Sequence, residues 1–181
     1  MNLPEYQQSY SPDTTISFYI ASGRYGFLSN LWVCDVIFEG KIYKSAEHAY
    51  QAGKSSKDEI NDYITIAPYP RIAALVGHNL SIYDIRPDWS RIKIGRMKSV
   101  VEAKFFQNEG LADMLLDTQD ALLQEDSTDS FWGIGKKGTG RNELGKILMD
   151  VRAHMKTTKT MKTDMDNRRK EEARQRNGRM I

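Results

Sequence analysis

The sequence contains a single cysteine, no long apolar run and no histidines at metal-ligand spacing. Because Cys34 stands alone, an intrachain disulfide and a cysteine-based metal site are excluded. No apolar run reaches the about 18 residues that a membrane span needs, so we expect no membrane partner. The N-terminus lacks the basic and apolar regions of a secretory signal, which predicts a cytoplasmic protein. Since His48, His78 and His154 show no ligand spacing, no metal and no other cofactor is expected.

Charge is distributed unevenly along the chain. Residues 156–181 carry nine basic and four acidic side chains, a net charge of +5, whereas the whole chain has a formal net charge of +2. This tail has few large apolar residues, which is typical of a solvated extension, flexible or helical. The alternative is a basic arm that contacts nucleic acid. We therefore divide the chain into a loose leader (residues 1–14), one domain (residues 15–155) and the basic tail (residues 156–181).

Short strands and longer helices follow one another without a regular βαβ order. The β-branched and aromatic runs Thr15–Ile20 and Val33–Phe38 predict strands, and a turn at Gly40 leads into Lys41–Tyr43. Apolar spacing and the caps Ser45 and Asp88 predict helices at Ser45–Lys54, Lys57–Ile66, Arg71–Val76, Trp89–Gln107 and Leu111–Leu116, then a short strand at Ala121–Gln124 and a last helix from Asn142. The pattern indicates an α+β fold, a mostly helical single domain around a small antiparallel sheet.

The helix expected at Ser45–Lys54 has two distinct faces. Small and aromatic residues recur on one of them at the spacing of a buried stripe. Glu47, Gln51 and Lys54 form a second stripe beside it. Because Glu47 and Lys54 are roughly 10 Å apart along the helix axis, their side-chain ends can converge on a ligand of sugar size. The alternative is an ordinary solvent-exposed polar face.

The loop Asp129–Gly145 (DSFWGIGKKGTGRNELG) combines an acid, aromatic residues, glycines and cations immediately before an amphipathic helix. Its glycines Gly133, Gly135 and Gly138 have the G-x-G-x-x-G spacing, but the polar segment before them and the absence of a βαβ unit exclude a dinucleotide fold. Glycine amides near a helix start, with basic side chains beside them, favour binding of a phosphate group. The sequence therefore predicts a ligand site at this loop.

The three tryptophans, Trp32, Trp89 and Trp132, each adjoin loop or cap residues. At such positions an aromatic plane can stack on a base. The alternative for each is burial in the core.

Four segments together resemble the NADAR family, which is named for its association with NAD and ADP-ribose and includes the YbiA-like N-glycosidases. They are YGFLSNL at Tyr25–Leu31, YKSAEHAYQAGK at Tyr43–Lys54, RPDWSRIKIGRMKSVVEAKFFQN at Arg86–Asn108 and DSFWGIGKKGTGRNELGKILMDVR at Asp129–Arg152. The resemblance extends over about Ser17 to Arg152. Leu31 departs from it, because an aromatic residue is usual there, and the family pattern does not include the basic tail.

The resemblance implies hydrolysis of the C–N glycosidic bond between a phosphorylated ribose and a base or amine. Two substrate classes are associated with the family: ribosylamino-pyrimidine phosphates of riboflavin synthesis, and ADP-ribose linked to guanine, which makes nucleic acid a candidate partner. We expect catalytic roles for Glu47, Lys54 and Asp129. Substrate-binding roles are expected for Trp89, Trp132, Ser29, Asn30, Gly133, Gly135 and Asn142.

The chemistry of such a bond leaves two routes open. A carboxylate, Glu47 or Asp129, can stabilise the positive charge that develops at C1 or activate water, and one of the two can protonate the leaving nitrogen. Alternatively, a neutral Lys54 can attack C1 and form a transient Schiff base. Two other functions remain as alternatives, a non-catalytic module that binds ADP-ribose or NAD, and a nucleic-acid-associated protein that uses its basic tail.

Overall fold

The computed structural model describes residues 14–178, so all but one residue of the expected leader lies outside the described residues. Its elements are the strands β1 (Thr15–Phe18), β2 (Val36–Phe38), β3 (Lys41–Tyr43) and β4 (Leu122–Glu125), the 3-10 helix η1 (Gly26–Leu28), and the helices α1 (Ala46–Ala52), α2 (Asp58–Thr65), α3 (Pro70–His78), α4 (Trp89–Gln107), α5 (Glu109–Asp117) and α6 (Glu143–Gly178). The α+β single domain is confirmed. None of the helices in residues 14–178 is long and apolar enough to cross a membrane.

The strands form two separate pairs instead of the one antiparallel sheet that the sequence predicts. Strands β2 and β3 make an antiparallel hairpin. Its two-residue turn has positive φ angles at Glu39 (50°) and Gly40 (76°), as a tight hairpin turn of this twist requires. Strands β1 and β4 pair in parallel, with Phe18 opposite Glu125. A parallel pair needs a long crossover, and here helices α1 to α5 lie between the two strands in the sequence.

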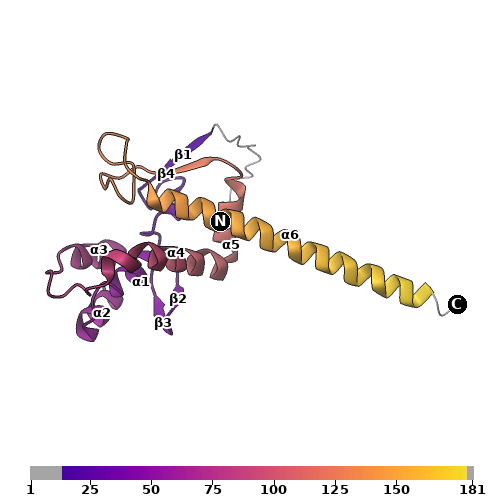
Figure 1. Ribbon diagram of the computed structural model, residues 1–181, viewed down its shortest axis with the longest axis horizontal. Coiled ribbons are helices and arrows are strands. Elements are labelled where there is room, and N and C mark those ends of the chain that lie inside the picture. Colours follow the sequence, from indigo (N-terminus) through magenta and orange to yellow (C-terminus); the bar gives the residue numbers. More distant parts are fainter. Residues whose placement is uncertain (1–13, 179–181) are drawn as a thin grey trace.

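Helices α4 and α6 form the centre of the domain. In Figure 1, α6 passes between the β1–β4 pair on one side and α4 on the other, while the β2–β3 hairpin lies beyond α4. Helix α4 is buried on two faces, because Met97 and Val101 belong to the core shared with α6, whereas Val100 packs into a second core around α1 and α2. The apolar face of the amphipathic helix that the sequence predicts after the glycine-rich loop is buried in α6. It consists of Leu144, Ile147, Leu148, Val151 and Met155.

Helix α1 begins as predicted at Ser45, whose hydroxyl accepts a hydrogen bond from the backbone N–H of His48. Ala46 and Ala49 are completely buried, so α1 can pack closely against its neighbours. The other predicted cap behaves differently. Asp88 precedes α4, but its carboxylate pairs with the Arg86 guanidinium and makes no capping hydrogen bond to the helix.

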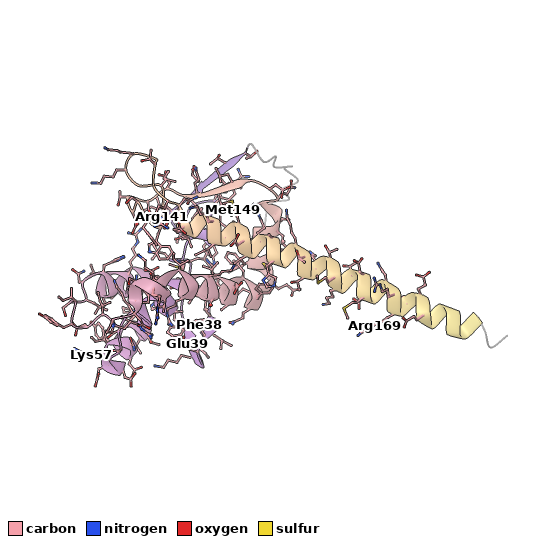
Figure 2. All side chains as sticks on the ribbon, viewed as in Figure 1. Phe38, Glu39, Lys57, Arg141, Met149 and Arg169 are labelled. Carbon is pink, nitrogen blue, oxygen red and sulfur yellow. The ribbon has the colours of Figure 1, made fainter. Side chains whose placement is uncertain are left out.

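The last helix is much longer than the domain requires. After Met155, which is still buried, α6 continues to Gly178 as an extension that projects from the domain (Figure 1). Figure 2 shows Arg169 on this extension, away from every other element. The basic tail is therefore helical over its described part.

Candidate active site

A cavity of about 590 Å³ lies between α1, α3, α4 and the loop that follows β4. The side chains and backbone that line it are those of Tyr19, Ser29, Asn30, Leu31, Glu47, Tyr50, Gln51, Lys54, Ala74, His78, Trp89, Lys93, Met97, Glu125, Ser127, Thr128, Asp129, Trp132 and Leu144. Seven of the ten predicted site residues are among them. The structure thus brings together groups that are as far apart in the sequence as Ser29 and Trp132.

Glu47 reaches the cavity from the first turn of α1 and is 9% exposed. Its Oε1 accepts a hydrogen bond of 2.8 Å from Gln51 Nε2, one helical turn further on. Burial raises the pKa of the Glu47 carboxyl, while the Gln51 hydrogen bond acts in the opposite direction by stabilising the charged form. Glu47 is therefore a candidate to exchange protons with a ligand.

Helix α1 ends at Ala52, two residues before the end that the sequence predicts, so Lys54 lies just beyond the helix but still lines the same cavity as Glu47. Its Nζ donates a hydrogen bond of 2.6 Å to the carbonyl oxygen of Gly77 on α3. Burial lowers the pKa of the Lys54 ammonium, and the neighbouring Glu47 partly offsets this effect. A neutral amine can keep its bond to the Gly77 carbonyl and still present a lone pair, which a nucleophile requires.

Three aromatic side chains form one wall of the cavity. Tyr50 packs against Trp89 with ring centroids 5.1 Å apart and against Trp132, edge to face, with centroids 5.6 Å apart. Both tryptophans were predicted for the site. Tyr50 belongs to the stripe of small and aromatic residues on this helix that was predicted to be buried. The wall offers apolar, π-rich surface to a flat group such as a base.

Asp129 has a structural task in addition to its place in the cavity lining. Its Oδ1 accepts hydrogen bonds from the backbone N–H groups of Phe131 (2.7 Å) and Trp132 (2.9 Å). The carboxylate therefore fixes the turn that presents Trp132. Next to it, the Phe131 ring contacts two cations, Lys93 Nζ at 3.7 Å and the Arg141 guanidinium at 4.7 Å from the ring centroid. These contacts place positive charge close to the cavity.

Ser29 and Asn30 enter the cavity from the segment after η1, and both are buried. The Asn30 amide nitrogen contacts Met97 Sδ at 3.1 Å, and its Oδ1 is buried without a hydrogen-bond partner. The segment is held from behind by Lys104, a completely buried side chain on α4. Its Nζ donates to the carbonyl oxygens of Phe27 (2.6 Å) and Ser29 (2.8 Å), and burial lowers its pKa to about 7.

Three predicted substrate-binding residues, Gly133, Gly135 and Asn142, do not line the cavity. The glycine-rich loop folds on itself, since the Gly133 N–H donates to the Asp129 carbonyl. Gly135 has a φ of 67°, which glycine adopts without strain, so its role is to turn the chain. Asn142 binds β4, because its Oδ1 accepts from the Glu125 N–H (3.0 Å) and its Nδ2 donates to the Leu123 carbonyl (2.8 Å).

Glu125, His78 and Lys93 line the cavity and were not predicted. Glu125 is the most unusual of them. Burial, together with the charges of Glu47 and Asp129, raises the pKa of its carboxyl to about 8, and its Oε2 is buried without a hydrogen-bond partner. The sequence signal for Glu125 was weak, because it is one of several acidic residues in a polar stretch after a short strand. Within residues 14–178, no three His, Cys, Asp or Glu side chains are arranged to hold a metal ion.

Comparison with known proteins gives consistent results along most of the chain. A family model described as the NADAR domain matches residues 17–156. Riboflavin biosynthesis protein VVA0006 of Vibrio vulnificus is 38% identical over 141 residues, which are 77% of this chain but only 38% of that protein. N-glycosidase YbiA of Escherichia coli is 34% identical over 144 residues, 79% of this chain and 89% of that one. The NMR structure of E. coli YbiA superimposes with a TM-score of 0.78 and 34% identity, covering 85% of this chain and 92% of the other.

Proposed function

Because the chain belongs to the NADAR domain family, we propose that it is an N-glycosidase, a hydrolase that cleaves the C–N bond between a phosphorylated ribose and an amine or base. Relatives that match over nearly their whole length are named N-glycosidases, which supports this assignment. The observation that supports the proposal in this protein is that Glu47 and Lys54 line the same cavity. Burial shifts the pKa values of both groups toward their neutral forms.

We favour the lysine route for the reaction. The ribosylamine opens to an imine, and Lys54 Nζ attacks C1 so that the leaving nitrogen departs as an amine and C1 becomes a Schiff base of Lys54. Water then adds to C1, and the C1–Nζ bond breaks to release the ribose. Glu47, hydrogen-bonded to Gln51 and beside Lys54, accepts and returns protons during these steps. The lowering of the Lys54 pKa by burial supports the route, because only the neutral amine is nucleophilic.

The remaining side chains bind the substrate. The Tyr50, Trp89 and Trp132 rings would hold the base or amine by stacking. Lys93 would attract the phosphate, since it is a cation in the cavity lining. The glycine-rich loop contributes by presenting Trp132, because its amides are largely used within the loop.

The substrate we expect first is a ribosylamino-pyrimidine phosphate, because two relatives carry names that refer to riboflavin biosynthesis. ADP-ribosylated guanine is the second class. Release of free base or amine from both classes should be measured in parallel with the purified protein. Tight binding of ADP-ribose without any product from either class would show a non-catalytic binding module and would contradict the proposal.

Substitutions at the two central residues test the mechanism. We expect Lys54→Ala and Glu47→Gln each to lower kcat by about 100-fold or more, the usual contribution of a nucleophile or an acid–base group. Borohydride added during turnover should reduce the Schiff base and leave the ribose covalently attached, as detected by mass spectrometry, in the wild-type protein but not in Lys54→Ala. Lys57→Ala is the matched control, because Lys57 pairs with Asp84 outside the cavity. Turnover without any trapped adduct would favour the carboxylate route.

A further inference from the structure

Glu125 ends strand β4 and places a third carboxyl group in the cavity, beside Glu47 and Asp129. Neither the proposed nucleophile nor its acid–base partner explains why a carboxyl group is buried at this position. Placing a charge there is unfavourable unless it is paired or hydrogen-bonded. Its Oε2, however, is buried without any hydrogen-bond donor.

The backbone of Glu125 is fixed on both sides. Its N–H donates to Asn142 Oδ1, and its carbonyl oxygen accepts from the Ile134 N–H at 2.9 Å. Strand β1 lies alongside, with Phe18 in register, and the Phe18 carbonyl accepts from the N–H of Asp126 at 2.9 Å. Three segments, the start of α6, the loop after β4 and strand β1, therefore fix the backbone from which the Glu125 side chain enters the cavity.

The charged and titratable groups around Glu125 favour its neutral form. The titratable side chains that line the same cavity are Tyr19 after β1, Glu47 and Tyr50 on α1, Lys54 just after α1, His78 on α3, Lys93 on α4, and Asp129 in the loop. Burial is the largest effect on the Glu125 carboxyl, and the negative charges of Glu47 and Asp129 add to it. Glu47 differs, because it accepts a hydrogen bond from Gln51 and lies near the Lys54 amine.

We propose that Glu125 is the general acid of the reaction, a carboxyl group in the cavity lining that delivers a proton to the leaving nitrogen. This inference rests on the proposed N-glycosidase function. The proton passes from Glu125 to the nitrogen, and the C1–N bond breaks with its electron pair on that nitrogen. Water then supplies the oxygen at C1, and its two hydrogens restore the Glu125 carboxyl group and the Lys54 amine. Each turnover therefore consumes one water molecule and leaves the enzyme unchanged.

Glu125→Gln tests the role, because glutamine keeps the size and the neutrality of the group but has no proton to donate. We expect kcat to fall by about 100-fold or more, with KM within about threefold of the wild-type value. In the wild-type protein, kcat should decline as pH rises through about 8, since Glu125 loses its proton there. That decline should be absent from the residual activity of Glu125→Gln. Asp126→Asn is the matched control, because it removes a neighbouring carboxylate that lines a different, smaller cavity.

A second measurement does not depend on turnover. In protein labelled with ¹³C at the glutamate carboxyl carbons, one signal should titrate near pH 8 and be absent from Glu125→Gln. A Glu125 signal that titrates in the ordinary range, or a Glu125→Gln variant with full kcat, would overturn the proposal. If no substrate of either class is cleaved, the N-glycosidase function itself fails and the proton-donor role fails with it, whereas the titration still reports whether Glu125 holds a proton.

Discussion

Gly77 on α3 lies against two side chains that line the cavity, Gln51 on α1 and Lys54 just after α1. Its carbonyl oxygen accepts the hydrogen bond from Lys54 Nζ. A Cβ atom at this position would overlap the Gln51 Oε1 atom, and Gln51 is the residue that donates to Glu47. The absence of a side chain at Gly77 therefore allows Gln51 to lie where it can donate its hydrogen bond to Glu47.

Gly77→Ala should consequently lower kcat by about 10- to 100-fold, because small displacements of positioned groups are costly in catalysis. The fold should be retained, with a loss of about 1–3 kcal/mol from the overpacked contact. Gly95→Ala is the control, since Gly95 is an exposed glycine in α4 whose added Cβ meets no atom. It should stabilise the protein by about 0.5–1 kcal/mol and leave kcat unchanged. Equal kcat values for the two variants would show that Gly77 does not position Gln51.

Among the elements, the junction of β4 and α6 depends on Asn142. This residue has a φ of 51°, is buried, and satisfies one N–H and one carbonyl group of β4 with its amide. It can do so because Gly145, on the first turn of α6, has no Cβ to displace the Asn142 side chain. The start of the last helix and the end of the last strand are thereby joined through one side chain.

We expect Asn142→Ala to lower the free energy of unfolding by about 2–4 kcal/mol, because two buried polar groups of β4 lose their partners. Asn142→Gly should lose about 1 kcal/mol less, since glycine adopts the positive φ without strain. Both values can be measured by urea unfolding monitored by tryptophan fluorescence. Equal stability of Asn142→Ala and the wild-type protein would mean that the amide does not hold β4 in solution.

Local sequence patterns were enough to predict the part of the site that lies on one short stretch of the chain. The spacing of Glu47 and Lys54 predicts one helix through both residues. Helix α1 ends at Ala52, before Lys54, but the structure still places both side chains in one cavity. Glu125 could not be found in this way, because its raised pKa depends on burial and on the charges of Glu47 and Asp129, and its position depends on the pairing of β4 with a strand more than a hundred residues earlier. The role of Gly133 was predicted from glycine's ability to expose amides, whereas the loop uses its amide internally.

At the scale of the whole molecule, the site and the basic extension lie at opposite ends of α6. Leu144, on the first turn, lines the cavity, whereas the extension leaves the domain at the other end (Figure 1). The domain continues beyond Arg152, where the family resemblance seen in the sequence ends. Met155 is still buried, and Lys156 donates to the Gln119 carbonyl and pairs with Asp120. Beyond Lys156, the ion pair of Lys159 with Asp113 is exposed on both sides.

Removal of residues 160–181 should therefore leave the melting temperature unchanged. The rate of turnover of a small substrate should stay within about twofold of the wild-type rate. This segment has seven basic and four acidic residues, a net charge of +3. Its loss should weaken binding to duplex DNA and reduce the salt dependence of that binding. Fluorescence anisotropy over a salt series measures both effects. A truncated protein that no longer turns over the small substrate would show that the extension belongs to the catalytic unit.

Because α6 is one continuous helix, the length of the extension can be calculated from its number of residues. At about 1.5 Å per residue, the described helix between Lys156 and Gly178 extends about 33 Å beyond the domain. Since about 3.4 Å separates successive nucleotides along a strand of a duplex, a polyanion held at the tip would be bound about ten base pairs beyond the edge of the domain. A polyanion at that position would therefore lie outside the cavity, and a ligand of one or two nucleotides cannot contact both ends of the helix.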